Sequence, residues 1–346
     1  MDSLSCVILF TLGIEKNRAD QAVPHSMNGN KEEVMQTYSR RQLFQFAAGA
    51  AAAAGTGQLF GKATAGAPAE ASKKALRLGL LVRVSDDPEK VMAQVHGLGL
   101  PTAHVMIWDF SPAMAARLRG ALDRYEVEAT VLYSSGPGEE KYDLVDGPPG
   151  FGLIPSRYRR QRIDQLKRAS DFAKRVGVPA LFNQWGFIPE VPSDPLYEPT
   201  VEAVREIAVH CKGNGQMFFN ETGQETPITL LRTIQDAGTD NLGLVLDAAN
   251  LVLYGKGNPV DALDVIGSYV RAIHVKGGFY PTDPKHLGRQ VPASQSSKVD
   301  WPRIFQRRKE LGYEGTATIE AGNPGTGGDQ EILGDKAYLE RLIAQG

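Results

Sequence analysis

This sequence of 346 residues contains only two cysteines, Cys6 and Cys211, and no Cys-x-x-Cys pair. The lack of paired cysteines excludes a zinc ribbon and a fold held together by several disulfides. Charge of one sign is also lacking, since 38 Lys and Arg residues face 40 Asp and Glu residues. A nucleic-acid groove or an anionic membrane surface needs a clustered basic excess, so neither partner is expected. The balance favours a small-molecule partner and is compatible with a homo-oligomer.

Residues 1–75 differ from the rest of the chain. A twin-arginine pair, Arg40 and Arg41, precedes an Ala- and Gly-rich apolar stretch at 43–60, and small-residue cleavage sites follow near residue 65. This order is typical of an export signal, and the arginine pair favours the twin-arginine route to the periplasm or another extracytoplasmic compartment. A transmembrane anchor is the alternative, although Gly and Ala make the stretch weakly apolar. We predict a leader with no stable membrane span after cleavage.

Strand-like and helix-like segments alternate from residue 76 onward. Short apolar runs predict eight strands, at 76–82, 102–107, 128–132, 179–182, 216–220, 242–246, 270–275 and 316–319. Amphipathic segments predict helices at 87–97, 112–124, 157–176, 199–212, 227–237, 259–266, 301–311 and 333–344. The strands are apolar on consecutive residues, which indicates that both faces are covered. Eight such repeats predict an α/β fold, a single (β/α)8 TIM barrel over residues 76–346.

A doubly wound open sheet is the competing architecture. It usually carries a Gly-rich phosphate-binding turn after its first strand, and the residues at 83–88 contain no glycine. Long connections at 133–156, 183–198 and 277–300 all follow predicted strands, so they gather at the same rim of the barrel and can roof a pocket.

Four ionisable residues stand at the carboxyl ends of the last four predicted strands: Glu221, Asp247, His274 and Glu320. These ends converge at the rim where the active sites of such barrels lie. Three carboxylates near one another repel unless a cation lies between them. Each carboxylate has an alternative role as a helix N-cap, and the histidine as a structural polar residue. Their occurrence on four consecutive strands favours one divalent metal.

The ligand types indicate which metal is expected. One nitrogen and three carboxylates make a hard site, for which Mn2+ is the first expectation, with Mg2+, Co2+ or Zn2+ as alternatives. The remaining histidines of this region are weaker candidates, because His96 and His210 lie in predicted helices, His104 in mid-strand and His286 in a loop.

The sequence resembles the xylose isomerase-like TIM barrel superfamily of sugar isomerases and epimerases over about residues 76–345. The resemblance is most specific at 221–226 (ETGQET), 246–251 (LDAANL), 274–276 (HVK), 299–302 (VDWP) and 311–315 (LGYEG). It implies that Glu221, Asp247, His274 and Glu320 bind the catalytic metal, and that Glu221 and Glu320 also transfer the substrate proton. The expected reaction on a ketose or keto-sugar passes through a metal-stabilised enediolate.

Several further residues are expected to bind substrate. Lys276 follows His274 on the same strand face and either neutralises a substrate oxyanion or forms a salt bridge at the rim. Asn250 stands where many epimerases have His. Trp108 and Trp185 follow strand ends and either stack on a sugar or pack in the core. Gln184, at a position where relatives often have His, is one of several departures that indicate a changed substrate or reduced activity.

Three functions stay open at this stage. The first is a metal-dependent sugar isomerase or epimerase. The second is a lyase or hydratase that acts on 3-keto-glycosides by β-elimination, and the third is a metal- or sugar-binding protein without turnover. Relatives that cleave DNA share the barrel, but the histidines and the basic groove that they need are missing here.

Overall fold

Eight parallel strands form a closed barrel in the computed structural model, which describes residues 76–320 and 328–345. The strands are β1 (Arg77–Arg83), β2 (Thr102–Met106), β3 (Glu128–Tyr133), β4 (Ala180–Phe182), β5 (Met217–Glu221), β6 (Leu242–Asp247), β7 (Val270–Val275) and β10 (Thr316–Ile319). Each strand pairs with its neighbours in the chain, and β1 closes the barrel by pairing with β10. The predicted (β/α)8 fold is confirmed. The predicted leader and its export signal lie outside the described residues.

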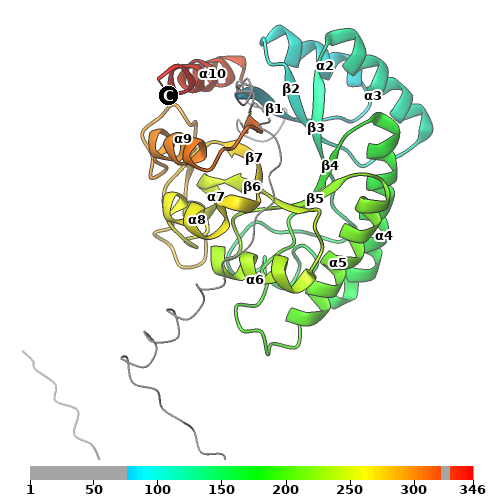
Figure 1. Ribbon diagram of the computed structural model, residues 1–346, viewed down its shortest axis with the longest axis vertical. Coiled ribbons are helices and arrows are strands. Elements are labelled where there is room, and N and C mark those ends of the chain that lie inside the picture. The colour runs from blue at the N-terminus through cyan, green and yellow to red at the C-terminus, as the bar shows by residue number, and fades with distance from the viewer. Residues whose placement is uncertain (1–75, 321–327, 346) are drawn as a thin grey trace, which may run out of the picture. The chain divides into compact units, whose positions relative to one another are not determined.

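Helices surround the barrel on its outer side (Figure 1). They are α2 (Pro88–Gly97), α3 (Pro112–Tyr125), α4 (Ser156–Val176), α5 (Tyr197–Gly213), α6 (Pro227–Ala237), α7 (Ala248–Leu253), α8 (Pro259–Ile266), the 3-10 turn η1 (Gly267–Tyr269), α9 (Trp301–Glu310) and α10 (Asp329–Ala344). Local sequence explains where several helices begin, because the side chains of Asp87, Ser111 and Asp300 cap helices that have proline in the first turn. No helix among the described residues is long and apolar enough to cross a membrane.

Two apolar clusters lie on the two faces of the strands. On β3, Val131 and Tyr133 belong to a small cluster that also contains Phe182, Phe219 and Val245. Leu132, between them, belongs to the large cluster that includes the buried faces of the helices. Successive residues of a strand point to opposite faces, so the small cluster fills the barrel interior and the large one packs strands against helices.

Three short elements of the rim, one helix and a pair of strands, depart from the predicted pattern. The short helix α7 directly follows β6, in a segment where no helix was predicted. The segment predicted as a loop at 277–300 contains an antiparallel pair, β8 (Gly277–Gly278) and β9 (Gln290–Val291). All three elements are too short to show a periodic pattern, and they lie beside the carboxyl ends of the strands that position the candidate site.

Candidate metal centre and substrate cavity

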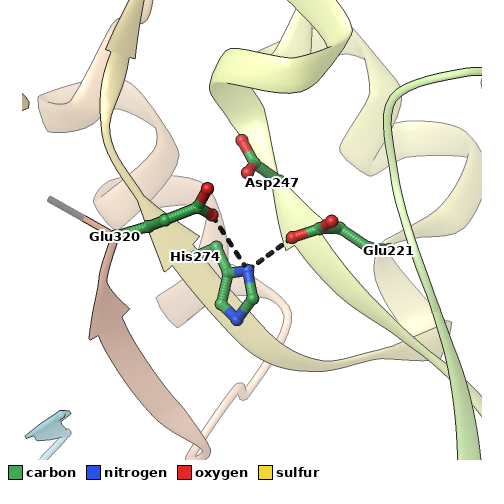
Figure 2. Close-up of side chains that lie close together, drawn as sticks. All are labelled: Glu221, Asp247, His274 and Glu320. Carbon is green, nitrogen blue, oxygen red and sulfur yellow. Dashed lines mark hydrogen bonds and ion pairs between the residues drawn. The ribbon is translucent and has the colours of Figure 1, made fainter. Parts of the chain in front are cut away.

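The four predicted ligands converge at the carboxyl ends of neighbouring strands. Glu221 ends β5, Asp247 ends β6, His274 lies one residue before the end of β7, and Glu320 directly follows β10. One ligand-capable atom of each residue lies within 4.8 Å of those of the others. Figure 2 shows the side chains pointing toward one another. The strand register accounts for this, because Asp247 pairs with His274, and Thr318, two residues before Glu320, also pairs with His274.

Asp247 caps a helix with one carboxylate oxygen and directs the other at the cluster. Its Oδ1 accepts a hydrogen bond of 2.8 Å from the backbone N–H of Asn250 and caps α7. Its Oδ2 is buried, lies 2.7 Å from Lys276 Nζ and makes no well-oriented hydrogen bond with the described residues. Thr222 holds the strand end in place, since its Oγ1 donates to Asp247 O and accepts from Asp247 N, each at 2.9 Å. Asp247 therefore directs one oxygen at the start of α7 and the other at Lys276 in the cluster.

The ring of His274 is fixed from both sides. Nδ1 lies 2.5 Å from Glu221 Oε1 and 3.4 Å from Glu320 Oε2, so this nitrogen faces the carboxylates. Nε2 lies 2.8 Å from His104 Nδ1. His104 is fully buried, and burial, followed by the charge of His274, holds the pKa of His104 well below its usual range. The neutral His104 therefore accepts the Nε2 proton of His274 and leaves Nδ1 directed at the cluster.

Lys276 supplies a positive charge beside the carboxylates. Its Nζ lies 2.7 Å from both Asp247 Oδ2 and Glu320 Oε1, and its side chain is almost fully buried. Burial alone would lower the pKa of Lys276, but the neighbouring carboxylates Asp247 and Glu320 raise it, so the amine stays charged. The salt bridge expected as one of its two roles is present, and Lys276 also lines the cavity.

The pKa values of the cluster are shifted in different directions by burial and by neighbouring charges. Burial raises the pKa of Asp247 despite the opposing charge of Lys276. Burial also acts to raise the pKa of Glu320, but Lys276 and His274 overcome it and hold that pKa below its usual range. Burial acts to lower the pKa of His274, yet Glu221 and Glu320 raise it to about 9. The pocket therefore favours positive charge.

The residues fit a divalent cation. Carboxylate oxygens and an imidazole nitrogen are ligands that Mn2+, Mg2+ and Zn2+ accept, and a carboxylate-rich set favours the harder ions. Asp247 Oδ2, which is paired with Lys276, and Glu320, which lines the cavity, provide oxygens directed at the centre. Glu221, Asp247, His274 and Glu320 would hold the ion.

A cavity of about 970 Å3 opens beside the cluster. Its walls include Arg83, Trp108, Tyr133, Ser135, Glu140, Tyr142, Gln184, Gln224, Asn250, Tyr254, Leu287 and Gln290, besides Glu221, Lys276 and Glu320. Of the four residues expected to bind substrate, Trp108, Asn250 and Lys276 line this cavity. Trp185 is fully buried in the large cluster, with its ring centroid 5.6 Å from that of Phe218. Trp185 therefore packs in the core, the other role that its position allowed.

Three residues that line the cavity, Gln184, Glu140 and Tyr142, were not assigned a functional role from the sequence. Gln184 Nε2 donates to Glu221 Oε2 at 2.6 Å, and Tyr133 Oη donates to Gln184 Oε1 at 3.0 Å. Glu140 and Tyr142 line the cavity from the loop after β3. The position of Gln184 shortly after β4 could have indicated a role at the site. Nothing in the sequence marks a glutamate and a tyrosine inside a long loop in the same way.

Comparison with known proteins agrees with this architecture. The model of the xylose isomerase-like TIM barrel family matches residues 93–342. A xylose isomerase domain protein from Planctomyces limnophilus is 30% identical, with a TM-score of 0.73 over 79% of this chain and 100% of that chain. No curated protein matches the chain.

More distant structures share the fold. A xylose isomerase-like TIM barrel protein from Mycobacterium smegmatis, in complex with magnesium, is 16% identical with a TM-score of 0.58, covering 79% of this chain and 97% of that chain. D-psicose 3-epimerase from Clostridium cellulolyticum H10, with D-tagatose, is 14% identical with a TM-score of 0.58, covering 78% of this chain and 99% of that chain. The family match extends over most of the barrel, so this chain belongs to the xylose isomerase-like TIM barrel family.

Proposed function

We propose that the protein is a divalent-metal-dependent isomerase or epimerase of a ketose or keto-sugar. The observation that carries the proposal is the convergence of Glu221, Asp247, His274 and Glu320 at one end of a cavity large enough for a sugar. A D-psicose 3-epimerase among the structures with the same fold is consistent with this proposal. Its low identity supports the fold only, so the proposal depends on the side chains of this chain.

In this proposal, Glu221 and Glu320 move the substrate proton. Glu221 and Glu320 come from β5 and β10, which flank β6 and β7, and they lie on opposite sides of His274 (Figure 2). A substrate carbon held between them exposes one face to each carboxylate. One glutamate removes the proton beside the carbonyl, and either glutamate returns it. Return to the other face of the same carbon gives an epimer, whereas return to the neighbouring carbon, with transfer of the hydroxyl proton to the former carbonyl oxygen, gives an isomer.

The surrounding residues hold these bases in position. His274 and Gln184 each contact one oxygen of Glu221, which fixes the orientation of its carboxylate. Lys276 donates to Glu320 Oε1 at 2.7 Å and keeps that carboxylate ionised and able to accept a proton. A bound divalent cation would supply polarisation of the substrate carbonyl and stabilisation of the negative charge that develops on it.

Metal analysis and hydrogen exchange test the proposal together. Purified protein loaded with Mn2+ is incubated in deuterated water with ketoses and, separately, with 3-keto-glycosides. Deuterium uptake beside the carbonyl, with a change of sugar identity and no bond cleavage, supports the isomerase or epimerase. Release of the aglycone instead supports the lyase, and neither change with either substrate class rejects turnover of keto-sugars.

A further inference from the structure

Glu221 is held by a neighbouring side chain at each of its carboxylate oxygens. His274 Nδ1 lies 2.5 Å from Oε1 (Figure 2), and Gln184 Nε2 donates to Oε2 at 2.6 Å. His104 orients the ring of His274 through its second nitrogen, as described above. The side chain of Gln184 also has two ends, because an amide carries a nitrogen and an oxygen of almost the same size. The end that faces Glu221 decides whether this contact attracts or repels.

The backbone on both sides of Gln184 is fixed by contacts that do not involve its side chain. Before it, Asn183 Nδ2 donates to Ser134 O at 2.8 Å. After it, Trp185 N donates to Asn220 Oδ1 at 2.7 Å. All of these residues are buried. The freedom that Gln184 retains is therefore rotation of its side chain, and a contact that fixes the amide fixes the whole residue.

Tyr133 of β3 makes this contact with the oxygen end of the amide. Its Oη donates to Gln184 Oε1 at 3.0 Å. The strand register explains the arrangement, because Tyr133 pairs with Phe182 and Phe182 pairs with Phe219. Gln184 and Glu221 each follow these paired residues by two positions, so they lie at the same level on neighbouring strands. Tyr133 and Glu221 therefore contact Gln184 from the strands on either side of β4.

The phenol of Tyr133 is rigid and keeps its proton. The side chain is buried, and its ring centroid lies 4.7 Å from that of Phe182 and 5.9 Å from that of Trp108. Burial, followed by the neighbouring Tyr142 and Glu140, raises the pKa of Tyr133 well above its usual range. A protonated phenol in a fixed position is a permanent hydrogen-bond donor.

The donors and acceptors of these three residues run in one direction. An ionised Glu221 accepts hydrogen bonds and donates none, so the nitrogen end of the Gln184 amide faces it and the oxygen end faces Tyr133. With the amide turned round, two acceptor oxygens would lie at the 2.6 Å separation of this contact. Tyr133 stabilises the first arrangement because its O–H satisfies the buried amide oxygen.

We infer that Tyr133 is a positioning residue for Glu221, which it orients by fixing the amide of Gln184. This role rests on the proposed function, because Glu221 is the base and metal ligand that is positioned. Without the phenol hydroxyl, the amide oxygen of Gln184 has no other donor among the described residues and turns toward the cavity, which Gln184 lines. Glu221 then loses the donor at Oε2, and its carboxylate can rotate while it still contacts His274.

The amide protons of Gln184 report this arrangement directly. In the metal-free full chain with isotope-labelled glutamine, the side-chain resonances of Gln184 are those that disappear in Gln184→Leu. A hydrogen bond to a carboxylate moves one of the two proton resonances downfield. We expect this downfield shift in the wild type and its loss in Tyr133→Phe. An unchanged resonance in Tyr133→Phe overturns the positioning role. A wild-type resonance without the shift also overturns it, and that measurement does not require the variant to fold.

A double-mutant cycle measures the consequence for metal binding. Calorimetric titration with Mn2+ should show that Tyr133→Phe and Gln184→Leu each weaken binding about tenfold. The double variant should bind no more weakly than Gln184→Leu, because Tyr133 acts through Gln184. Unchanged affinity in Tyr133→Phe, or losses that add to about a hundredfold in the double variant, overturn the positioning role.

An exposed tyrosine provides the matched control. Tyr280 is 41% exposed and is not among the residues that line the cavity, and its Oη lies 3.4 Å from Gly257 O. Tyr280→Phe removes the same hydroxyl and should leave both the Gln184 resonances and the Mn2+ affinity unchanged. Circular dichroism of each variant checks that the barrel persists.

The two measurements separate this role from the proposed function. A wild type that binds no Mn2+ and exchanges no hydrogen on keto-sugars rejects the proposed function, whereas a downfield resonance that depends on Tyr133 still supports the orientation of Glu221 through Gln184. A wild type that binds Mn2+ and exchanges hydrogen, with neither property altered in Tyr133→Phe, rejects the positioning role and leaves the isomerase or epimerase in place.

Discussion

His104 Nδ1 lies 2.8 Å from His274 Nε2, so a buried histidine of β2 determines which nitrogen of His274 faces the carboxylate cluster. The neutral His104 accepts the Nε2 proton, and its own Nε2 lies 3.4 Å from Thr316 Oγ1. These contacts form a chain of hydrogen bonds from the cluster toward the barrel interior. A metal-binding imidazole needs such an acceptor on its second nitrogen, because the acceptor fixes both the tautomer and the ring orientation.

Replacement of His104 by Phe should therefore weaken metal binding. Phe keeps a ring of similar size in the interior but accepts no proton from His274, so we expect the affinity for Mn2+ to fall about 10- to 100-fold. Calorimetric titration of the metal-free protein measures this change. His96→Phe is the control, because His96 is exposed on α2 and should leave the affinity unaltered. Wild-type affinity in the His104 variant would contradict the role given to this residue.

Glu221→Gln and Glu320→Gln should each abolish hydrogen exchange beside the substrate carbonyl. An amide keeps the size of the side chain but accepts no proton, so the expected loss is at least about a hundredfold. Deuterium incorporation measured by mass spectrometry gives the rate, and circular dichroism checks that the barrel persists. Exchange at the wild-type rate in either variant removes that glutamate from the proton-transfer step.

Lys276→Met should destabilise the metal-free protein and increase the gain in unfolding free energy that metal binding provides. The substitution leaves the buried carboxylates of Asp247 and Glu320 without their cation, and loss of one partner of a buried pair costs about 3–5 kcal/mol of unfolding free energy. Denaturant unfolding with and without Mn2+ measures both effects. Lys212→Met provides the control, since that salt bridge with Asp240 is largely exposed. Equal stability of the two variants without metal would refute the argument.

Glu225→Gln should stabilise the protein, more at high pH than at low pH. Burial raises the pKa of Glu225 from its usual 4.5 to about 8, and Asn220 and Lys256 offset only part of this effect. Between pH 4.5 and about pH 8, Glu225 has lost its proton in the unfolded chain but keeps it in the native protein. Through this group the wild-type free energy of unfolding therefore falls as pH rises, by up to about 1.4 kcal/mol per pH unit.

Chemical denaturation from pH 5 to pH 9 measures this pH dependence. The gain from Glu225→Gln should grow across the range and level off above pH 8. Glu139→Gln, an exposed control, should show no such growth. A constant difference between wild type and Glu225→Gln at all pH values would show that Glu225 does not titrate in this way.

Much of the barrel could be predicted because each repeat carries its own local signals. The predicted strands at 102–107, 270–275 and 316–319 agree with β2, β7 and β10 to within one residue. Runs of consecutive apolar residues specify strands covered on both faces, and their alternation with amphipathic segments leaves few topologies. The short elements α7, β8 and β9 escaped prediction because tertiary contacts, and not periodicity, specify them.

The residues around the cluster were harder to predict than the cluster itself. The four predicted ligands all lie at strand ends, and strand ends can be recognised in the sequence. His104 lies in mid-strand, and Glu140 lies in a long loop, so neither position indicates proximity to the site. Trp185 follows a strand end just as Trp108 does, yet it packs into the core while Trp108 lines the cavity. The direction of a side chain beyond a strand end depends on the loop that follows.

The sequence by itself determined the closed barrel and the four residues that meet at its rim, because strand order and the direction of parallel strands bring their carboxyl ends together. Only the tertiary structure decided which nitrogen of His274 faces the cluster, that Lys276 bridges Asp247 and Glu320, and that Glu140 in the cavity wall lies 3.6 Å from Arg162. These arrangements depend on distances of a few ångströms between residues far apart in the chain, which no local pattern encodes.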